Sequence, residues 1–166
     1  MREENRIVHG VWIGDRLSLM ERLTITLFQN QGHEFHLWSY APIENAPDGT
    51  VWRDAAKVLP EASIFQFDGI PFVGLPNAGK GSLSHWSDQF QCRLLYREGG
   101  IYSQMDISVL RPLDFEAPYI FAPHTDRSIA PMIMKAPKGS EFAKVCYETL
   151  SAEINADTIR SMHWDC

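Results

Sequence analysis

The sequence is poor in cysteine, in positive charge and in long apolar runs, and each absence excludes a class of protein. A net charge of −6 disfavours nucleic acid as a partner, because nucleic-acid binding requires a basic surface. No apolar run approaches the ~20 residues that span a bilayer, so any membrane contact would be peripheral or through a partner. The charged start, MREENR, is unlike a secretory signal.

Cysteine is represented only by Cys92, Cys146 and Cys166, which are too few for a disulfide framework and lack the spacing of metal ligands. This usage predicts a reducing, cytoplasmic setting. The chain has no internal repeat and no low-complexity tract. With 166 residues, 45% of them hydrophobic, it is expected to form a single domain over residues 1–166.

The most informative stretch is residues 82–113, which predicts a helix, a glycine turn and a strand. Apolar residues at spacings of three and four mark one helical face, and a second, polar stripe runs through Ser84, His85, Asp88 and Gln91. Ser82 is a candidate N-cap, and Gly99 and Gly100 end the helix. In the strand that follows, side chains alternate between the two faces, which places Tyr102, Gln104 and Asp106 on one face.

The remaining segments predict an α/β fold. Residues 6–13 and 35–40 are expected strands with a helix over 17–31 between them, a unit that favours parallel pairing. Residues 51–59 are expected to be helical, and strands are expected at 63–67, 119–122 and 129–135. Residues 68–81 predict a loop in which 77–80 would reach a substrate. Ser140 is expected to cap a last helix, which frays from Asn155.

This arrangement resembles the DxD-containing sugar transferases of the GT-A fold, a family that includes capsular-polysaccharide and mannosyl transferases. The family combines an S-D pair on a helix with the motif G-G-x-Y-x-D-x-D and a following L-x-P-L. The matching positions are Ser87, Asp88, Gly99, Gly100, Tyr102, Asp106, Leu110, Pro112 and Leu113. Further matches are His9, Trp12, Leu37, Trp38 and the run APKG at 136–139.

The resemblance implies a Rossmann-like, mixed but mostly parallel sheet flanked by helices. It implies binding of a nucleotide-diphosphate sugar, with Trp12 and Tyr102 on the base and Asp88 on sugar hydroxyls. Gln91 and Gln104 occupy the two other donor-binding positions of the pattern. Asp106 would bind a divalent cation, Mn²⁺ or Mg²⁺. Residue types alone also allow simpler roles: Trp12 and Tyr102 in the core, Asp106 in a turn, and His9 as a buried strand histidine.

Two positions depart from the family pattern. Gln104 replaces the first aspartate of DxD, and a neutral amide oxygen would hold a divalent cation more weakly than a carboxylate. Gln91 replaces the arginine that follows the helix aspartate, which removes a fixed positive charge from the donor site. The resemblance also ends short of a typical member, so the chain is either a compact member or a piece of a longer protein.

Two functions follow from this pattern. The first is a glycosyltransferase, a hexosyltransferase by its family, that moves a sugar from its nucleotide donor to a glycan or other hydroxyl acceptor. His124 and Asp126 are candidate acceptor-side groups. The alternative is a non-catalytic pseudoenzyme, or a binding module in polysaccharide biosynthesis, motivated by the substitutions at Gln91 and Gln104.

Overall fold

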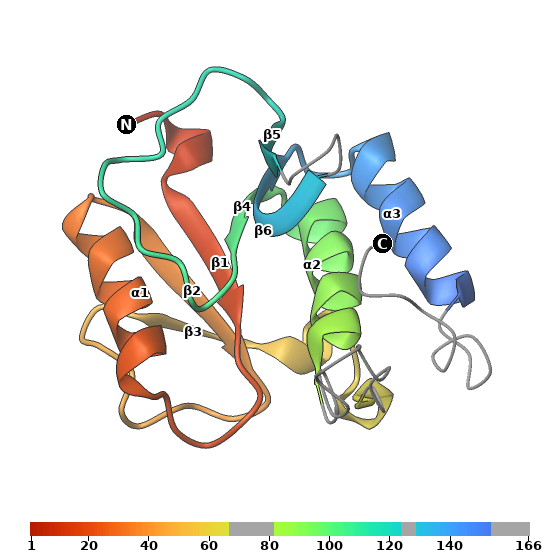
Figure 1. Cartoon of the computed structure of the whole chain (residues 1–166), viewed down its shortest axis with the longest axis horizontal. Helices are drawn as coiled ribbons and strands as arrows, with labels where there is room; N and C mark the ends of the chain where they lie inside the picture. The colour runs from red at the N-terminus through yellow and green to blue at the C-terminus, as the bar shows by residue number, and fades with distance from the viewer. Residues whose placement is uncertain (67–81, 124–128, 154–166) are drawn as a thin grey trace, which may run out of the picture.

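The fold is a six-stranded sheet flanked by three helices, seen in a computed structural model that describes residues 1–66, 82–123 and 129–153 (Figure 1). The strand order is β3-β2-β1-β4-β6-β5. This is the single α/β domain with a mixed, mostly parallel sheet that the sequence predicts. The expected loop at 68–81, the candidates His124 and Asp126, and the end of the chain from Asn155 lie outside the described residues.

The first half of the chain builds the parallel part of the sheet. β1 (Ile7–Val11) pairs in parallel with β2 (Glu34–Ser39) and with β4 (Gly100–Ser103). Between β1 and β2 lies α1 (Leu19–Asn30), which begins with a capping box formed by Ser18 and Glu21. The predicted strand–helix–strand unit is therefore confirmed.

Residues 51–66 correct two predictions. The expected helix at 51–59 is instead β3 (Val51–Asp54), an edge strand parallel to β2, followed by the 3-10 helix η2 (Ala55–Lys57). Val51 and Trp52 favour strands, and the open edge of β2 supplies hydrogen-bond partners that an isolated helical turn lacks. The strand expected at 63–67 is not formed in its described part, since Ser63 ends a 3-10 turn, η3 (Glu61–Ser63), and residues 64–66 belong to no strand.

The second half adds the helix that matters most for the site and the antiparallel edge of the sheet. α2 (Ser84–Glu98) leads into β4 through Gly99, and β6 (Ile129–Ala136) runs antiparallel to both β4 and β5 (Ile120–Pro123). α3 (Glu141–Glu153) follows, and the Ser140 hydroxyl accepts from the Ala143 amide as predicted. The strand predicted to carry Gln104 and Asp106 ends before them, at Ser103, so of the three residues expected on one strand face only Tyr102 lies in β4.

The core has one cluster on each face of the sheet. Ile25 and Phe28 of α1 pack on one face with Met105 and Val109 of the segment after β4. α2 and α3 cover the opposite face, where Trp86 of α2 lies in the second cluster (Figure 1). Because α1 and α2 lie on opposite faces, the carboxyl ends of β1 and β4 are left between their amino ends.

His9 and Trp38 form a buried pair that fixes this frame. The Trp38 indole N–H donates to His9 Nδ1 over 3.1 Å, so the His9 proton lies on Nε2, toward the backbone of Gly99. Burial, followed by the charges of His36 and Arg53, lowers the pKa of His9 to about 3. His9 is thus a neutral structural residue that joins β1, β2 and the end of α2.

Candidate functional site

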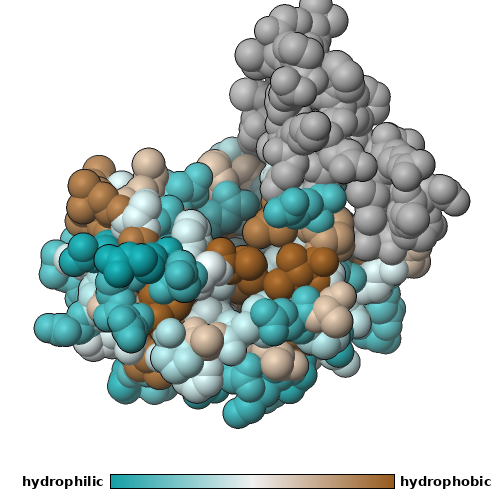
Figure 2. Space-filling view, turned by 90° about the horizontal axis from the view of Figure 1, so that it is seen from below, coloured by the Kyte–Doolittle hydropathy of each residue, from teal (hydrophilic) through white to brown (hydrophobic). Residues whose placement is uncertain are grey.

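A cavity of about 460 Å³ opens at the carboxyl ends of β1 and β4. Its walls come from the end of β1, the amino ends of α1 and α2, and the residues after β4. Figure 2 looks from below Figure 1 onto this end of the molecule, where apolar residues lie near the middle of a mostly hydrophilic face. Ligands of open α/β sheets bind at this edge, so its position favours a binding site.

Four of the six predicted site residues line this cavity, and two do not. Those that line it are Trp12, Tyr102, Gln104 and Asp106. Asp88 and Gln91 lie further along α2 and are absent from the lining. The predicted residues in or just beyond β1 and β4 therefore meet at this cavity, whereas the two on α2 lie outside its lining.

Trp12 is held in place by its own turn. Its backbone N–H continues the β1–β2 ladder by donating to Trp38 O, and its indole N–H donates to Arg16 O over 2.9 Å. Gly14, at φ +144, lies against the indole, where a Cβ would be 3.1 Å from Nε1. The half-buried ring is thus fixed at the cavity wall, and an aromatic surface of this kind suits stacking on a base.

The segment Gln104–Asp106 is clamped from three directions. The backbone N–H of Gln104 donates to Met132 O, and the backbone carbonyl of Met105 accepts from the Thr24 hydroxyl over 2.9 Å. The Met105 side chain packs over Gly10. Among the described residues, the side chains of Gln104 and Asp106 have no hydrogen bond or ion pair. The backbone that carries these two oxygen-bearing side chains is therefore held at the cavity, while the side chains themselves are available to a ligand.

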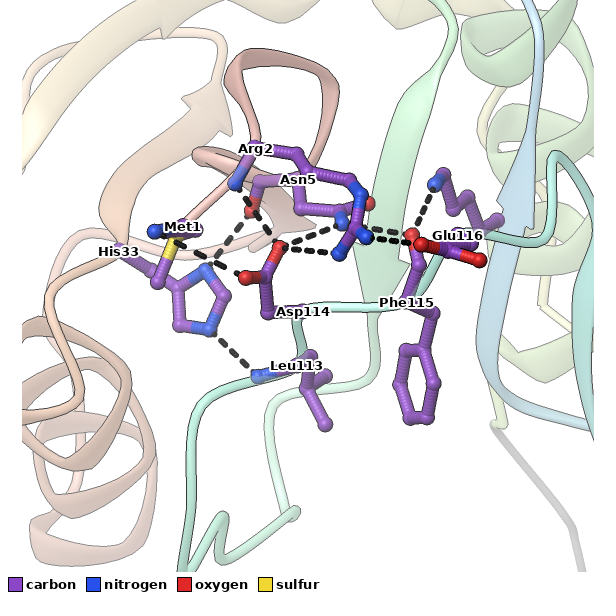
Figure 3. Close-up of polar contacts among 9 residues, drawn as sticks. Met1, Arg2, Asn5, His33, Leu113, Asp114, Phe115 and Glu116 are labelled. Carbon is purple, nitrogen blue, oxygen red and sulfur yellow. Dashed lines mark hydrogen bonds and ion pairs between the residues drawn. The ribbon is translucent and has the colours of Figure 1, made fainter.

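The segment after Asp106 is tied to the N-terminus (Figure 3). His33 Nε2 accepts from the Leu113 amide over 3.0 Å, and the buried Asn5 amide donates to Asp114 and to Phe115 O. The Arg2 backbone N–H, then the Asn5 side chain, lower the pKa of Asp114 to about 2. The long connection between β4 and β5 is thus anchored at both ends.

Asp88 is a partly buried carboxyl group with no hydrogen-bond partner among the described residues. It lies one helical turn beyond Ser84, which lines the cavity. Burial raises its pKa to about 6, since nothing nearby compensates the charged form. The same carboxyl helps to raise the pKa of the buried Tyr102 hydroxyl, after burial itself. A carboxyl group next to a cavity, with a pKa perturbed by burial, is typical of functional sites.

Gln91 is committed elsewhere. Its side chain is buried, its amide nitrogen donates to Pro131 O of β6 over 3.0 Å, and its carbonyl oxygen has no partner among the described residues. The role in donor binding implied for this residue is untested, and the observed contact attaches it to the sheet.

Sequence reasoning missed Glu21 and the start of α2. Glu21 lines the cavity while its carboxylate accepts from the Ser18 amide over 2.5 Å, and the Ser18-x-x-Glu21 spacing signals a cap rather than a site. Ser82, Leu83 and Ser84 bring the amino end of α2 to the wall. The N-cap of α2 is Leu83, which has no side-chain cap, so the N-cap predicted at Ser82 is wrong by one residue; the Ser82 hydroxyl nevertheless accepts from the Ser84 backbone N–H.

The charge of the lining is one-sided. Glu21 and Asp106 are acidic, and no lysine, arginine or histidine is among the described lining residues. Nor do the described parts of the chain hold a group of three or more histidine, cysteine, aspartate or glutamate residues that could by itself bind a metal ion. Any cation here would need further ligands from a bound molecule or water.

The chain is similar in fold to a known protein. No protein-family profile matches the chain, and no curated protein matches it. A solved structure named PaToxG Glycosyltransferase superimposes with a TM-score of 0.58 at 12% identity. The chain has a glycosyltransferase-like fold. The match covers 94% of this chain and 65% of that one, so the chain spans about two-thirds of its neighbour's length.

A membrane-spanning helix is not among the described elements, since none is both long and apolar enough to cross a bilayer.

Proposed function

We propose that this chain binds a nucleotide-diphosphate sugar in the cavity at the ends of β1 and β4 and transfers the sugar to a hydroxyl of a glycan acceptor. The observation that supports it is the meeting of Trp12, Gln104 and Asp106 at one cavity in a glycosyltransferase-like fold. A volume of about 460 Å³ suits a ligand of this class.

The charge of the cavity argues for a cation-assisted donor site. A diphosphate brought beside Glu21 and Asp106 would be repelled, because the described lining offers no basic side chain. The amino end of α2 supplies some positive potential through its free backbone N–H groups. A divalent cation such as Mg²⁺ or Mn²⁺ would neutralise the remaining negative charge of the diphosphate. Mg²⁺ is often held by one or two carboxylates together with substrate phosphates.

Each residue then has a distinct role. Asp106 and the amide oxygen of Gln104 would hold the divalent cation, which when bound neutralises charge on the departing diphosphate. Trp12 would stack on the base, with Tyr102 closing the floor beneath it. Asp88 would accept hydrogen bonds from sugar hydroxyls, and this contact would supply the partner that its carboxyl lacks.

Thermal unfolding with a panel of nucleotide sugars tests the donor site. We expect one donor to raise the melting temperature with Mn²⁺ or Mg²⁺ and not with a chelator, since a ligand at a hundredfold its Kd adds about 2.7 kcal/mol. Asp106→Ala should abolish the cation-dependent shift, and Gln104→Asp should strengthen it. Asp48→Ala, in an exposed loop outside the cavity, is the matched control and should behave as wild type.

A second function is a non-catalytic donor-binding protein. It is favoured by the neutral Gln104 and by Gln91, which stands where the family has a fixed arginine. The Gln91 side chain donates to Pro131 O, so it supplies no positive charge to the donor site. Donor hydrolysis or transfer by the purified chain distinguishes the two. A donor-dependent thermal shift without any turnover, in wild type and in Gln104→Asp, would select the binding protein.

A further inference from the structure

A second cavity, of about 430 Å³, lies at the amino ends of β1 and β4, the opposite end of the sheet from the proposed donor site. β4 begins there at Gly100, which lies between Ile7 of β1 and Ala136 of β6 in the lining. The walls are completed by η1 (Glu3–Asn5), the end of α2 and part of the connection between β4 and β5. In Figure 1 this connection arches over the same end of the sheet.

The start of β4 leaves the floor of this second cavity open. Gly100 has no side chain, and a Cβ there would lie 3.5 Å from His9 Nε2 and 3.7 Å from Ile7 O, so it would fill part of the space. A volume of about 430 Å³ is in the range of small-molecule sites. The cavity is therefore large enough for a ligand, and the charges of its lining indicate which kind.

Lys135 brings a buried positive charge to this lining. Only 4% of its surface is exposed, and its ammonium donates to the backbone carbonyl of Phe115 over 3.2 Å. That neutral carbonyl is its one hydrogen-bond partner, and it forms no ion pair, within the described parts of the chain. Because a buried ammonium without an anion is costly, a ligand carboxylate beside Lys135 would be favourable. Lys138, the other lysine of the lining, is exposed.

The lining also carries carboxylates, and two of them are uncommitted. Glu3 and Glu116 each form an ion pair with an arginine, at 3.6 Å and 2.6 Å. Glu4 of η1 and Glu98 of α2 line the same cavity, and neither side chain has a hydrogen bond or an ion pair with another described residue. These two carboxylates are therefore available to a cationic group of a ligand.

The sheet separates the two kinds of charge. Glu4 precedes β1, Lys135 lies on β6, and β4 runs between those two strands. Neighbouring strands lie ~4.8 Å apart, so the backbones of β1 and β6 are roughly 10 Å apart. A ligand that reaches both sides must hold its own charges several ångströms apart, which a single carbon between them does not allow.

We propose that this second cavity binds a small zwitterion whose carboxylate pairs with Lys135 and whose ammonium or guanidinium lies against Glu4 and Glu98. The ω-amino acids, such as 6-aminohexanoate, have this arrangement of charges. The carboxyl-terminal lysine or arginine of a peptide has the same arrangement. The site is separate from the proposed donor site, and the proposal does not depend on the function assigned there.

Isothermal titration of the full chain with 6-aminohexanoate tests the proposal. We expect saturable binding, with hexanoate and hexylamine each at least about tenfold weaker, because each analogue lacks one of the two charged contacts. 4-Aminobutyrate should also bind more weakly, since its charges are closer together. Nα-acetyl-lysine identifies the source: tighter binding than 6-aminohexanoate selects a peptide terminus, and weaker binding selects a free ω-amino acid.

Substitution of the lysine tests the anion-binding side of the site. Lys135→Met keeps the apolar stem, removes the ammonium and should abolish binding of 6-aminohexanoate. Lys144→Met makes the same change on the exposed face of α3, outside the cavity lining, and should bind as wild type.

Two pairs of substitutions with equal loss of charge test the cation-binding side. Glu4→Gln with Glu98→Gln should weaken binding at least about tenfold, because both available carboxylates are lost. Glu3→Gln with Glu116→Gln removes two carboxylates that are already paired with arginines and should bind close to wild type.

The comparison of ligands uses the unmodified chain, so it decides the matter independently of how the variants fold. Binding of hexanoate or hexylamine as tight as that of 6-aminohexanoate would overturn the proposal. So would equal weakening by the two pairs of glutamate substitutions, or the absence of saturable binding by every probe.

Discussion

At the scale of single residues, Asp88 combines burial, charge and lack of a partner. Its carboxyl group is partly enclosed, accepts no hydrogen bond within the described residues, and has a pKa raised by burial to about 6. A carboxylate kept in such a place at neutral pH destabilises the fold, since burial penalises the charged form. Such a cost is tolerated where a ligand supplies the missing contacts.

This reasoning predicts how Asp88→Asn changes stability with pH. The folded pKa is raised above the usual 3.8, so the favourable contribution of the protonated carboxyl is complete below pH 3.8 and is lost as pH rises to about 6. Asp88→Asn should therefore raise the free energy of unfolding by about 1–3 kcal/mol at pH 7.5. It should have little effect near pH 4. Urea unfolding at both pH values measures the difference.

The control for this prediction is Asp48→Asn on the exposed loop between β2 and β3, which should change stability equally at the two pH values. If Asp88 binds the donor, Asp88→Asn should also weaken the donor-dependent thermal shift. A variant that is less stable than wild type at pH 7.5 would show that the carboxylate has a stabilising partner and would contradict the argument.

Sequence patterns brought to the cavity the predicted residues in or just beyond the strands, but not those on α2. Trp12 and Asp106 follow strand ends, and parallel strands deliver such residues to one edge of a sheet. Gln91 belongs to the same polar stripe as Asp88, but the approach of β6 takes its amide for Pro131 O. Glu21 reaches the cavity through the placement of α1, which no local pattern encodes.

At the scale of elements, the Gly99–Gly100 turn joins α2 to β4 and also packs against the backbone of the segment before α3. Gly99 ends α2 at φ +70, and a Cβ there would lie 2.5 Å from the backbone nitrogen of Lys138. The adjacent Gly139 amide donates to Tyr96 O over 2.8 Å. The glycine pair and the APKG run are therefore two sides of one packing contact.

Alanine substitutions in this turn should have unequal effects. Both glycines have positive φ, which costs an alanine about 1–2 kcal/mol. A Cβ on Gly100 would meet His9 at an ordinary 3.5 Å, whereas one on Gly99 would displace the backbone at Lys138. Gly99→Ala should thus destabilise the fold by about 1–3 kcal/mol more than Gly100→Ala. Equal losses in chemical denaturation would mean that the chain before α3 moves aside freely.

Element prediction succeeded where periodicity was strong and failed where pairing decided the outcome. α1 and α2 each show an apolar stripe over three or more turns, and their boundaries agree with the sequence within a few residues. The segment 51–54 is too short to show a periodic pattern in the sequence. Its strand conformation comes instead from pairing with the free edge of β2. The end of β4 at Ser103 is likewise accompanied by a tertiary contact, because the Thr24 hydroxyl of α1 donates to Met105 O just beyond the strand.

At the scale of the whole molecule, the connection between β4 and β5 is held at two distant places. Near the cavity, the Thr24 hydroxyl donates to Met105 O. At the other end of the sheet, Asn5 donates to Asp114 and Phe115, and His33 accepts from Leu113 (Figure 3). The N-terminal residues thus help to hold the segment that begins with Asp106, although they lie at the amino end of β1 and the cavity lies at its carboxyl end.

The two anchors should be separable by mutation. Asn5→Ala removes two hydrogen bonds from a fully buried side chain and should destabilise the fold by about 1–3 kcal/mol. Hydrogen exchange should then accelerate at residues 112–116, while Thr24→Val should accelerate it at 104–107 instead. Gln29→Ala, which releases the loop at Asp48, is the control and should leave both ranges unchanged. Faster exchange over the whole of 104–119 in either variant would mean that the connection opens as one unit, so that the N-terminus and the cavity are mechanically coupled.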